Sequence, residues 1–300
     1  MVEAAAEKVL VEAPVVAPVA AEDVRPGWIR RLVRNRNGII GASILLGLIL
    51  AALLADHIST ANPTRLFPTN RLKPPSRQHY LGTDEFGRDV FSLVVHGSRI
   101  SLLVGGITML FTSAGGIMVG MVAGHSRRLD VVVMRIMEGL MAFPAILLAI
   151  ALMAARGPGV WNVVFALSVV YLPRTAMLIR STVLTIRELD YVHAARALGR
   201  RDFATAYRHI LPNCMAPLLV QGSFIFAYAI LAEAILGFLG VGVPPYVPSW
   251  GNVIASGKNV MREAFWVSLF PGLALTVAGL SLNLLGDGLR DVLDPRLRME

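Results

Sequence analysis

Six long apolar segments divide this chain, and they constrain its fold more than any other feature. They cover residues 38–55, 101–124, 131–155, 160–179, 215–240 and 264–285. A helix needs about 20 apolar residues to cross the roughly 30 Å hydrocarbon core of a bilayer. The segments therefore predict an all-α membrane protein with six transmembrane helices. The composition agrees, because only 16% of the residues are charged, against about 25% in soluble domains.

The net charge of +8 comes largely from arginines that flank the apolar segments, where basic residues are common in membrane proteins. No basic patch interleaved with aromatic residues accompanies this charge, so we expect no nucleic-acid partner. Cys214 is the only cysteine, which excludes an internal disulfide and a cysteine-based metal site. The charge thus fits insertion into a lipid bilayer.

The segments also predict how the chain is organised. We expect a disordered cytoplasmic tail, a first transmembrane region, an outer loop with an amphipathic segment, a core domain of five transmembrane helices, and a cytoplasmic C-terminal tail. In that order they cover residues 1–25, 26–58, 59–100, 101–290 and 291–300. Six spans place both termini on one side, and Lys and Arg are more frequent in the segments of that side. This bias predicts that both termini are cytoplasmic.

Small residues and prolines inside the segments predict how the helices pack. Gly116, Gly120 and Gly124 recur every four residues, a spacing that lets a second helix approach closely. Three further positions can kink a helix, because proline removes a backbone hydrogen bond. They are Pro144, Pro173 and Pro271.

A polar loop at residues 187–213 interrupts the apolar pattern on the cytoplasmic side. Its stretch "YVHAARALGRRDFATAYRHILPN" carries apolar residues at positions i, i+4 and i+7 of two short helices. Gly199 separates the helices, Asp202 is a candidate N-cap, and Pro212 ends the second. Patterning leaves three interpretations open: a helix in the lipid headgroup layer, a simple connector, or an element that inserts into a groove on a partner protein.

The sequence "AARALG", followed by "HILPN", resembles the EAA loop of permeases in binding-protein-dependent ABC importers. In that family the loop docks into a cleft of the ATPase subunit and transmits nucleotide-driven movement to the spans. His193 stands where the motif has Glu, and His209 where it has Ile. The resemblance assigns ATPase coupling to eight residues of what we call the coupling loop (187–213). They are His193, Ala194, Ala195, Gly199, Arg200, Asp202, Leu211 and Pro212.

Three longer blocks, at residues 79–105, 236–254 and 283–298, resemble the dipeptide, oligopeptide and nickel permease branch, and within it the second, C-type permease subunit. The resemblance implies a type I ABC importer permease fold and a multi-pass location in the bacterial inner membrane. It further implies half of a translocation pathway for di- or oligopeptides, with nickel chelates, glutathione or opines as other substrates. A gradient-driven secondary transporter is the alternative from a different class.

The partners that this resemblance implies are a second homologous permease, one or two ABC ATPase subunits, an extracytoplasmic solute-binding protein, a peptide and the lipid bilayer. ATP and Mg would be bound by the ATPase subunits, so we expect no cofactor in this chain. "GNVIASGKN" has five residues between its glycines and Asn259 where a P-loop has Ser or Thr. We therefore expect no ATPase site, no catalytic residue and no enzymatic activity here.

Four polar residues at membrane depth are candidates for lining a pathway, because charge in hydrocarbon is costly. They are Arg135, Glu138, Glu233 and Asn283. Each could instead hold helices together, and the spacing of Arg135 and Glu138 would let these two pair. The six histidines are scattered, so we expect no metal site, although His79 and His96 share the outer loop.

The segment "LGTDEFGRDVFS" of the outer loop alternates charged and apolar residues. This pattern predicts an amphipathic helix that lies near the outer mouth. Such a helix would contact a solute-binding protein or seal the periphery of the bundle.

Overall fold

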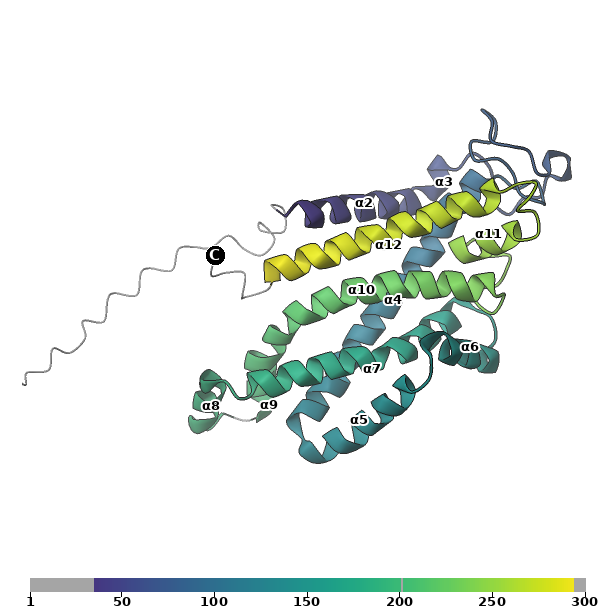
Figure 1. Cartoon of the computed structure of the whole chain (residues 1–300). Helices are drawn as coiled ribbons and strands as arrows, with labels where there is room; N and C mark the ends of the chain where they lie inside the picture. The colour runs from purple at the N-terminus through teal and green to yellow at the C-terminus, as the bar shows by residue number, and fades with distance from the viewer. Residues whose placement is uncertain (1–34, 201, 294–300) are drawn as a thin grey trace, which may run out of the picture.

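The computed structural model describes residues 35–200 and 202–293, which form a bundle of helices (Figure 1). Its longer helices are α2 (Arg36–Leu53), α4 (Val90–His125), α5 (Arg127–Met141), α6 (Ala145–Arg156), α7 (Val160–Ile186), α10 (Leu211–Phe238) and α12 (Trp266–Leu293). Its shorter ones are α3 (Ala55–Ile58), η2 (Pro68–Asn70), α8 (Asp190–Ala197), α9 (Asp202–Thr205), η3 (Ala206–Ile210) and α11 (Trp250–Gly257). The expected tail at 1–25 and the last residues of the expected C-terminal tail lie outside the described residues.

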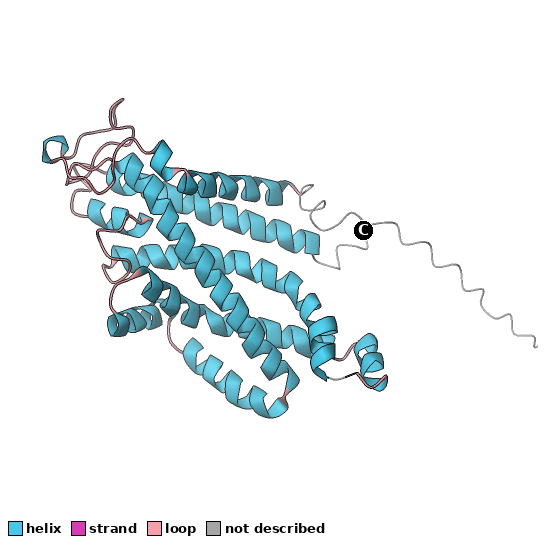
Figure 2. Cartoon of the chain, turned by 180° about the vertical axis from the view of Figure 1, so that it is seen from behind, coloured by secondary structure: helices cyan, strands magenta, loops and turns pink. Residues whose placement is uncertain are grey.

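The two ends of the bundle differ (Figures 1 and 2). At one end α2 begins, α12 ends, and α8 and α9 project beyond the long helices. Here Asn35 Nδ2 donates a hydrogen bond to Asp291 Oδ2 at 3.1 Å, so both ends of the described chain meet. The opposite end carries α3, α11 and the loop that joins α3 to α4. The coupling loop therefore lies on the same side as both described chain ends.

Five helices are long and apolar enough to cross a membrane, and a sixth crossing results if α5 and α6 form one bent span. The span predicted over 131–155 is broken near Pro144, one of the prolines expected to kink a helix, and α5 and α6 meet there at an angle of 93°. Pro144 forms the N-cap of α6 with an extended backbone (ψ 128°). Proline cannot donate the backbone hydrogen bond that would continue α5, and it disfavours a helical residue before it.

The start of α4 also differs from the prediction. This helix begins at Val90 rather than at residue 101, and Asp89 caps it by accepting a hydrogen bond from Ser92 N at 2.9 Å. Residues 81–89 form a loop instead of the predicted amphipathic helix. Asp84 Oδ1 accepts from the backbone N–H of Phe86 and of Arg88, which offers the chain a turn in place of a helix.

The glycine stripe of α4 lies against α7, as its spacing predicted. Gly116 faces Thr175, and Gly124 faces Val183 eight residues, or about two turns, further along each helix. A Cβ atom on Gly120 would lie 2.6 Å from Ile179 Cβ and 2.8 Å from the carbonyl oxygen of Ala176. Because these three positions of α4 have no side chain, side chains of α7 pack directly against the backbone of α4.

We predict that Gly120→Ala destabilises the protein, because the added methyl group forces α4 away from α7. Overpacking of this kind costs about 1–3 kcal/mol, which would lower the apparent midpoint of thermal unfolding in mild detergent by several degrees. Gly139→Ala on α5 is the control, because a Cβ there meets nothing within 4 Å. Equal midpoints for the two variants would contradict this account of the packing.

Candidate functional site

The coupling loop is a helical hairpin that turns at Gly199. Helix α8 ends at Ala197, and Arg200 N donates to Ala195 O at 3.2 Å across the turn. Gly199 has a φ of +77°, a left-handed conformation that glycine adopts without strain. A glycine in this conformation after the last helical residue is a common way to end a helix. The predicted break at Gly199 therefore has a backbone cause.

His209, which departs from the family motif, holds the two halves of the hairpin together. Arg200 Nη1 donates to His209 Nε2 at 3.0 Å. The His209 ring lies 6.1 Å from the ring of Tyr191 on α8. Asn213 Nδ2 donates to the carbonyl oxygen of His209 at 2.7 Å and to the Tyr191 hydroxyl at 3.3 Å. These contacts join α8 to the start of α10.

The other departing residue, His193, lines a polar pocket of about 430 Å³ between the hairpin and the ends of α4 and α7. His193 Nε2 lies 3.9 Å from Glu188 Oε2. On the opposite wall, His125 Nε2 of α4 lies 4.0 Å from Asp202 Oδ2, where α9 begins. Arg187 Nη1 donates to Gly124 O at 3.0 Å and so ties the end of α7 to α4. The hairpin is thus attached to the ends of α4 and α7.

The projecting surface of the hairpin carries apolar side chains. Leu198, next to the Gly199 turn, is 88% exposed, and Tyr191 near the start of α8 is 43% exposed. Of the predicted coupling residues, His193, Ala194, Gly199, Asp202 and Pro212 are exposed. Ala195, Arg200 and Leu211 are half-buried. Large apolar side chains that project beyond the bundle are typical of a surface that a partner covers.

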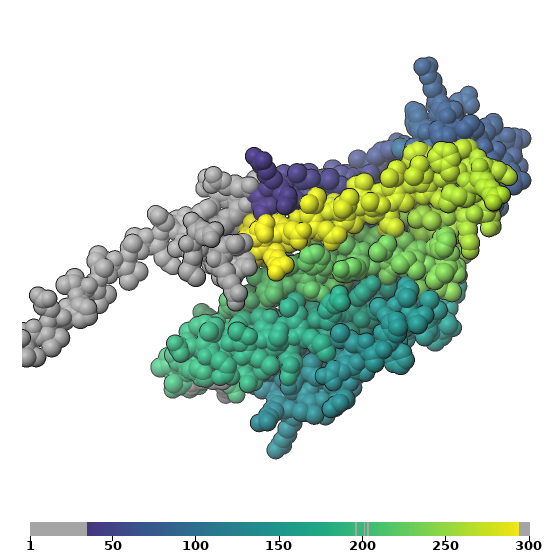
Figure 3. Space-filling view, viewed as in Figure 1, coloured from purple at the N-terminus to yellow at the C-terminus, as the bar shows by residue number. Residues whose placement is uncertain are grey.

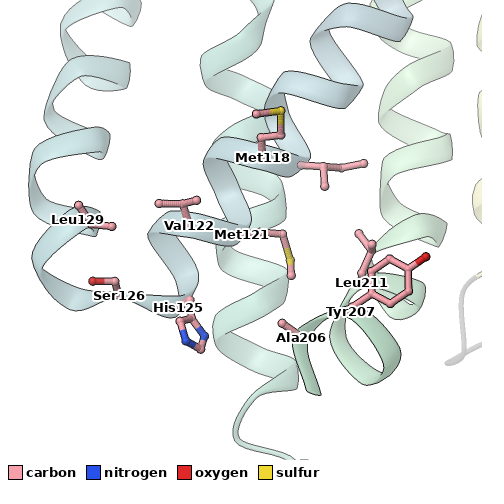
Figure 4. A pocket seen from close by; sticks show the side chains of 10 residues that line it. Met118, Met121, Val122, His125, Ser126, Leu129, Ala206, Tyr207 and Leu211 are labelled. Carbon is pink, nitrogen blue, oxygen red and sulfur yellow. The ribbon is translucent and has the colours of Figure 1, made fainter. Parts of the chain in front are cut away.

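An apolar groove of about 380 Å³ separates the root of the hairpin from the end of α4 (Figure 4). Met118 and Met121 of α4 line one side, and Tyr207 and Leu211 line the other. Methionine side chains are flexible and fill spaces of variable shape. The groove therefore leaves room for the hairpin to shift against α4.

The four predicted pathway residues lie in different surroundings. Glu233 is fully buried, and Ser101 Oγ of α4 donates to its Oε2 at 2.8 Å. Ser101 Oγ in turn accepts from Trp250 N of α11 at 3.2 Å, so Glu233 joins three helices. Asn283 is exposed on α12.

Arg135 and Glu138 are both exposed on α5. The described part of the chain shows no ion pair between them. Arg180 of α7 instead pairs with Asp130 of α5 through both its Nε and its Nη2, the latter 2.6 Å from Asp130 Oδ2. That pair, which the sequence did not reveal, holds α5 against α7.

The two outer-loop histidines have partners within the protein. His79 Nδ1 lies 3.2 Å from Asp89 Oδ1, and His96 Nε2 lies 3.2 Å from Asp56 Oδ1. Arg99 also contacts Asp56, and its hydrogen bonds hold the pKa of that carboxyl below its ordinary value. Within the described residues, no group of three or more His, Cys, Asp or Glu side chains could hold a metal ion.

Sequence reasoning missed one charged residue inside a span. Arg174 lies midway along α7 and is exposed. The signal was present, because a basic residue interrupts an otherwise uncharged apolar segment at 160–179.

We predict that Ser101→Ala destabilises the protein, because it removes one of the two hydroxyls, those of Ser101 and Ser249, that bond to the buried Glu233 carboxyl. A buried polar group that loses its partner costs about 1–3 kcal/mol, which would appear as a lower apparent midpoint of thermal unfolding in detergent. Ser113→Ala, on the same helix, removes a hydroxyl that lies away from Glu233 and serves as the control. A midpoint unchanged by Ser101→Ala would show that this contact contributes nothing to stability.

Comparison with known proteins places this geometry in a family. Residues 116–299 match the binding-protein-dependent transport system inner membrane component family, and residues 27–75 match the N-terminal TM domain of oligopeptide transport permease C. A Brucella abortus protein that carries the name of a peptide transport system permease is 49% identical over 90% of this chain and 92% of its own. The dipeptide transport system permease protein of Escherichia coli K12 is 39% identical over 94% of this chain and 96% of its own length.

A solved structure shares the fold. The crystal structure of an amino acid ABC transporter with histidines covers 66% of this chain and 92% of its own, with a TM-score of 0.52 and 17% sequence identity. This likeness, together with the family match, confirms the predicted all-α fold of a type I ABC importer permease. The chain belongs to the binding-protein-dependent transport system inner membrane component family.

Proposed function

We propose that this chain is the C-type permease subunit of a bacterial ABC importer and forms half of a pathway for di- or oligopeptides across the inner membrane. The support for peptides comes from relatives whose names state peptide or dipeptide transport and which align over about nine-tenths of the chain. Nickel chelates, glutathione and opines are the substrates that a transport assay should compare with peptides.

The observation that carries the proposal is the coupling loop. It projects beyond the long helices, exposes the apolar side chain of Leu198 at its tip, and is attached to α4, α7 and α10. An ATPase subunit that grips the tip would therefore pull on three spans at once. Arg200 and His209 stiffen the hairpin, while the apolar groove beside α4 gives it room to move.

The proposal includes the following further components. The coupling loop and both described chain ends would face the cytoplasm, where the partner ATPase subunits bind ATP and Mg. The opposite end, with the loop before α4, would face an extracytoplasmic solute-binding protein. A second homologous permease would complete the pathway. This chain would catalyse no covalent step and would need no cofactor of its own.

We predict that Gly199→Val lowers peptide uptake by about fivefold or more, because a β-branched residue in a left-handed conformation costs roughly 1–2 kcal/mol. The measurement is uptake of radiolabelled dialanine by cells in which this importer is the only peptide transporter. Immunoblots of the membrane fraction check that the variant is inserted.

Gly199→Asn is the matched variant, since asparagine tolerates positive φ better than other residues. It should retain most of the uptake, because a side chain at this position meets nothing within 4 Å in this chain. Full uptake by Gly199→Val would argue strongly against a role of the loop in coupling.

A further inference from the structure

Arg174 lies within a membrane-spanning helix, where exposing an arginine to lipid costs free energy. It lies midway along α7, with about 20 Å of helix on either side at 1.5 Å per residue. Its side chain is exposed in this subunit, and no hydrogen bond or ion pair to it exists among the described residues. The next arginine along α7, Arg180, is by contrast paired with Asp130. A charge at membrane depth faces the interior of a bundle or a water-filled cavity.

Beyond Arg174, toward the coupling loop, the exposed face of α7 carries hydroxyl groups. Ser181 and Thr185 follow it at i+7 and i+11, the spacing of one helical face, and both are exposed. Their hydroxyls donate to backbone oxygens of their own helix, to Leu178 O at 2.9 Å and to Ser181 O at 3.1 Å. Both hydroxyls lie beyond the apolar segment 160–179, whereas Arg174 lies within it beside Val170, Met177 and Leu178, so it is Arg174 itself that marks this face as polar within the membrane.

Two tyrosines border the same region. Tyr171, one turn before Arg174, donates from its hydroxyl to the carbonyl oxygen of Tyr228 on α10 at 3.3 Å. Both line a pocket of about 110 Å³ between α6, α7 and α10. Tyr228 is also partly exposed. The Tyr171 hydroxyl, whose proton is engaged with Tyr228 O, can still accept a hydrogen bond.

The bend between α5 and α6 opens at the same level. Ala145 and Ile146, the first residues of α6, line the pocket that Tyr171 and Tyr228 share. Residues 141–145 are all exposed in this subunit. Non-helical backbone at membrane depth is tolerated where it is covered by protein or lines a water-filled cavity, and broken helices often surround the substrate sites of transporters.

We infer that Arg174 is a substrate-binding residue of the translocation pathway and receives the carboxylate of the transported peptide. Its planar guanidinium can hold a carboxylate with two parallel hydrogen bonds. A weak site of this kind would stabilise a charged peptide inside the membrane and still let it dissociate. The inference rests on the proposed function, because it requires that peptides are the substrate.

The first test measures dialanine uptake by the complete importer carrying Arg174→Gln, Arg174→Lys or the control Arg127→Gln, which removes an exposed arginine at the start of α5. We expect Arg174→Gln to reduce uptake about tenfold, the factor for losing a charge-assisted hydrogen bond. Arg174→Lys should recover part of the uptake, and Arg127→Gln should match the unaltered importer. Co-purification of the second permease should not change. Full uptake by Arg174→Gln would overturn the inference.

A salt bridge from Arg174 to the second permease is the competing explanation, and the same experiment distinguishes it. Loss of the second permease from Arg174→Gln complexes would assign the residue to the subunit interface and overturn the inference. If the unaltered importer takes up no peptide at all, the proposed function fails before the site is tested.

A second test locates the substrate. Leu178→Cys places a thiol one turn from Arg174 on α7, and the natural Cys214 is buried. A charged methanethiosulfonate reagent should modify residue 178, and saturating dialanine should slow the reaction. With Arg174→Gln in the same chain, dialanine should no longer protect. An unreactive thiol, or protection that is independent of Arg174, would contradict a carboxylate site there.

Discussion

Close contact between α4 and α7 is the interaction on which the rest of the structure depends. Because Gly116, Gly120 and Gly124 carry no side chains, α7 lies directly on α4 from Thr175 to Val183. That contact brings the ends of both helices together under the coupling loop, where Arg187 of α7 binds the carbonyl oxygen of Gly124. It also leaves the opposite face of α7, with Arg174, uncovered. Packing on one face thus positions both the coupling loop and the polar face.

The space-filling view shows α12, α10, α7 and α5 side by side across one face of the molecule (Figure 3). Movement applied at the coupling loop enters this layer through α7 and α10, which adjoin the loop directly. Near the other end, Glu233, Ser101 and the backbone of Trp250 join α10, α4 and α11. Buried hydrogen bonds of this kind keep helices in register, so we infer that the far ends of α4 and α10 move together.

Hydropathy was sufficient to predict the helical class and the positions of the spans, because apolar length is what a bilayer selects. It could not predict the 93° bend at Pro144, since a proline in a membrane helix is compatible with any angle that the neighbours allow. The loop at 81–89 was mistaken for a helix, because Asp84 and the turn around Gly87 override an amphipathic pattern. Arg174 was visible in the sequence as a charge, but only the structure shows that Arg180 is paired with Asp130 while Arg174 is exposed.

The central claim is that this chain acts as one subunit of an ATP-driven assembly. Its most direct test is affinity purification of the chain from membranes of its own host in mild detergent, with mass spectrometry of the proteins that accompany it. We expect an ABC ATPase, a second permease and a solute-binding protein to accompany it. Recovery of the chain alone, stable and monodisperse, would contradict it and favour a transporter that works without an ATPase.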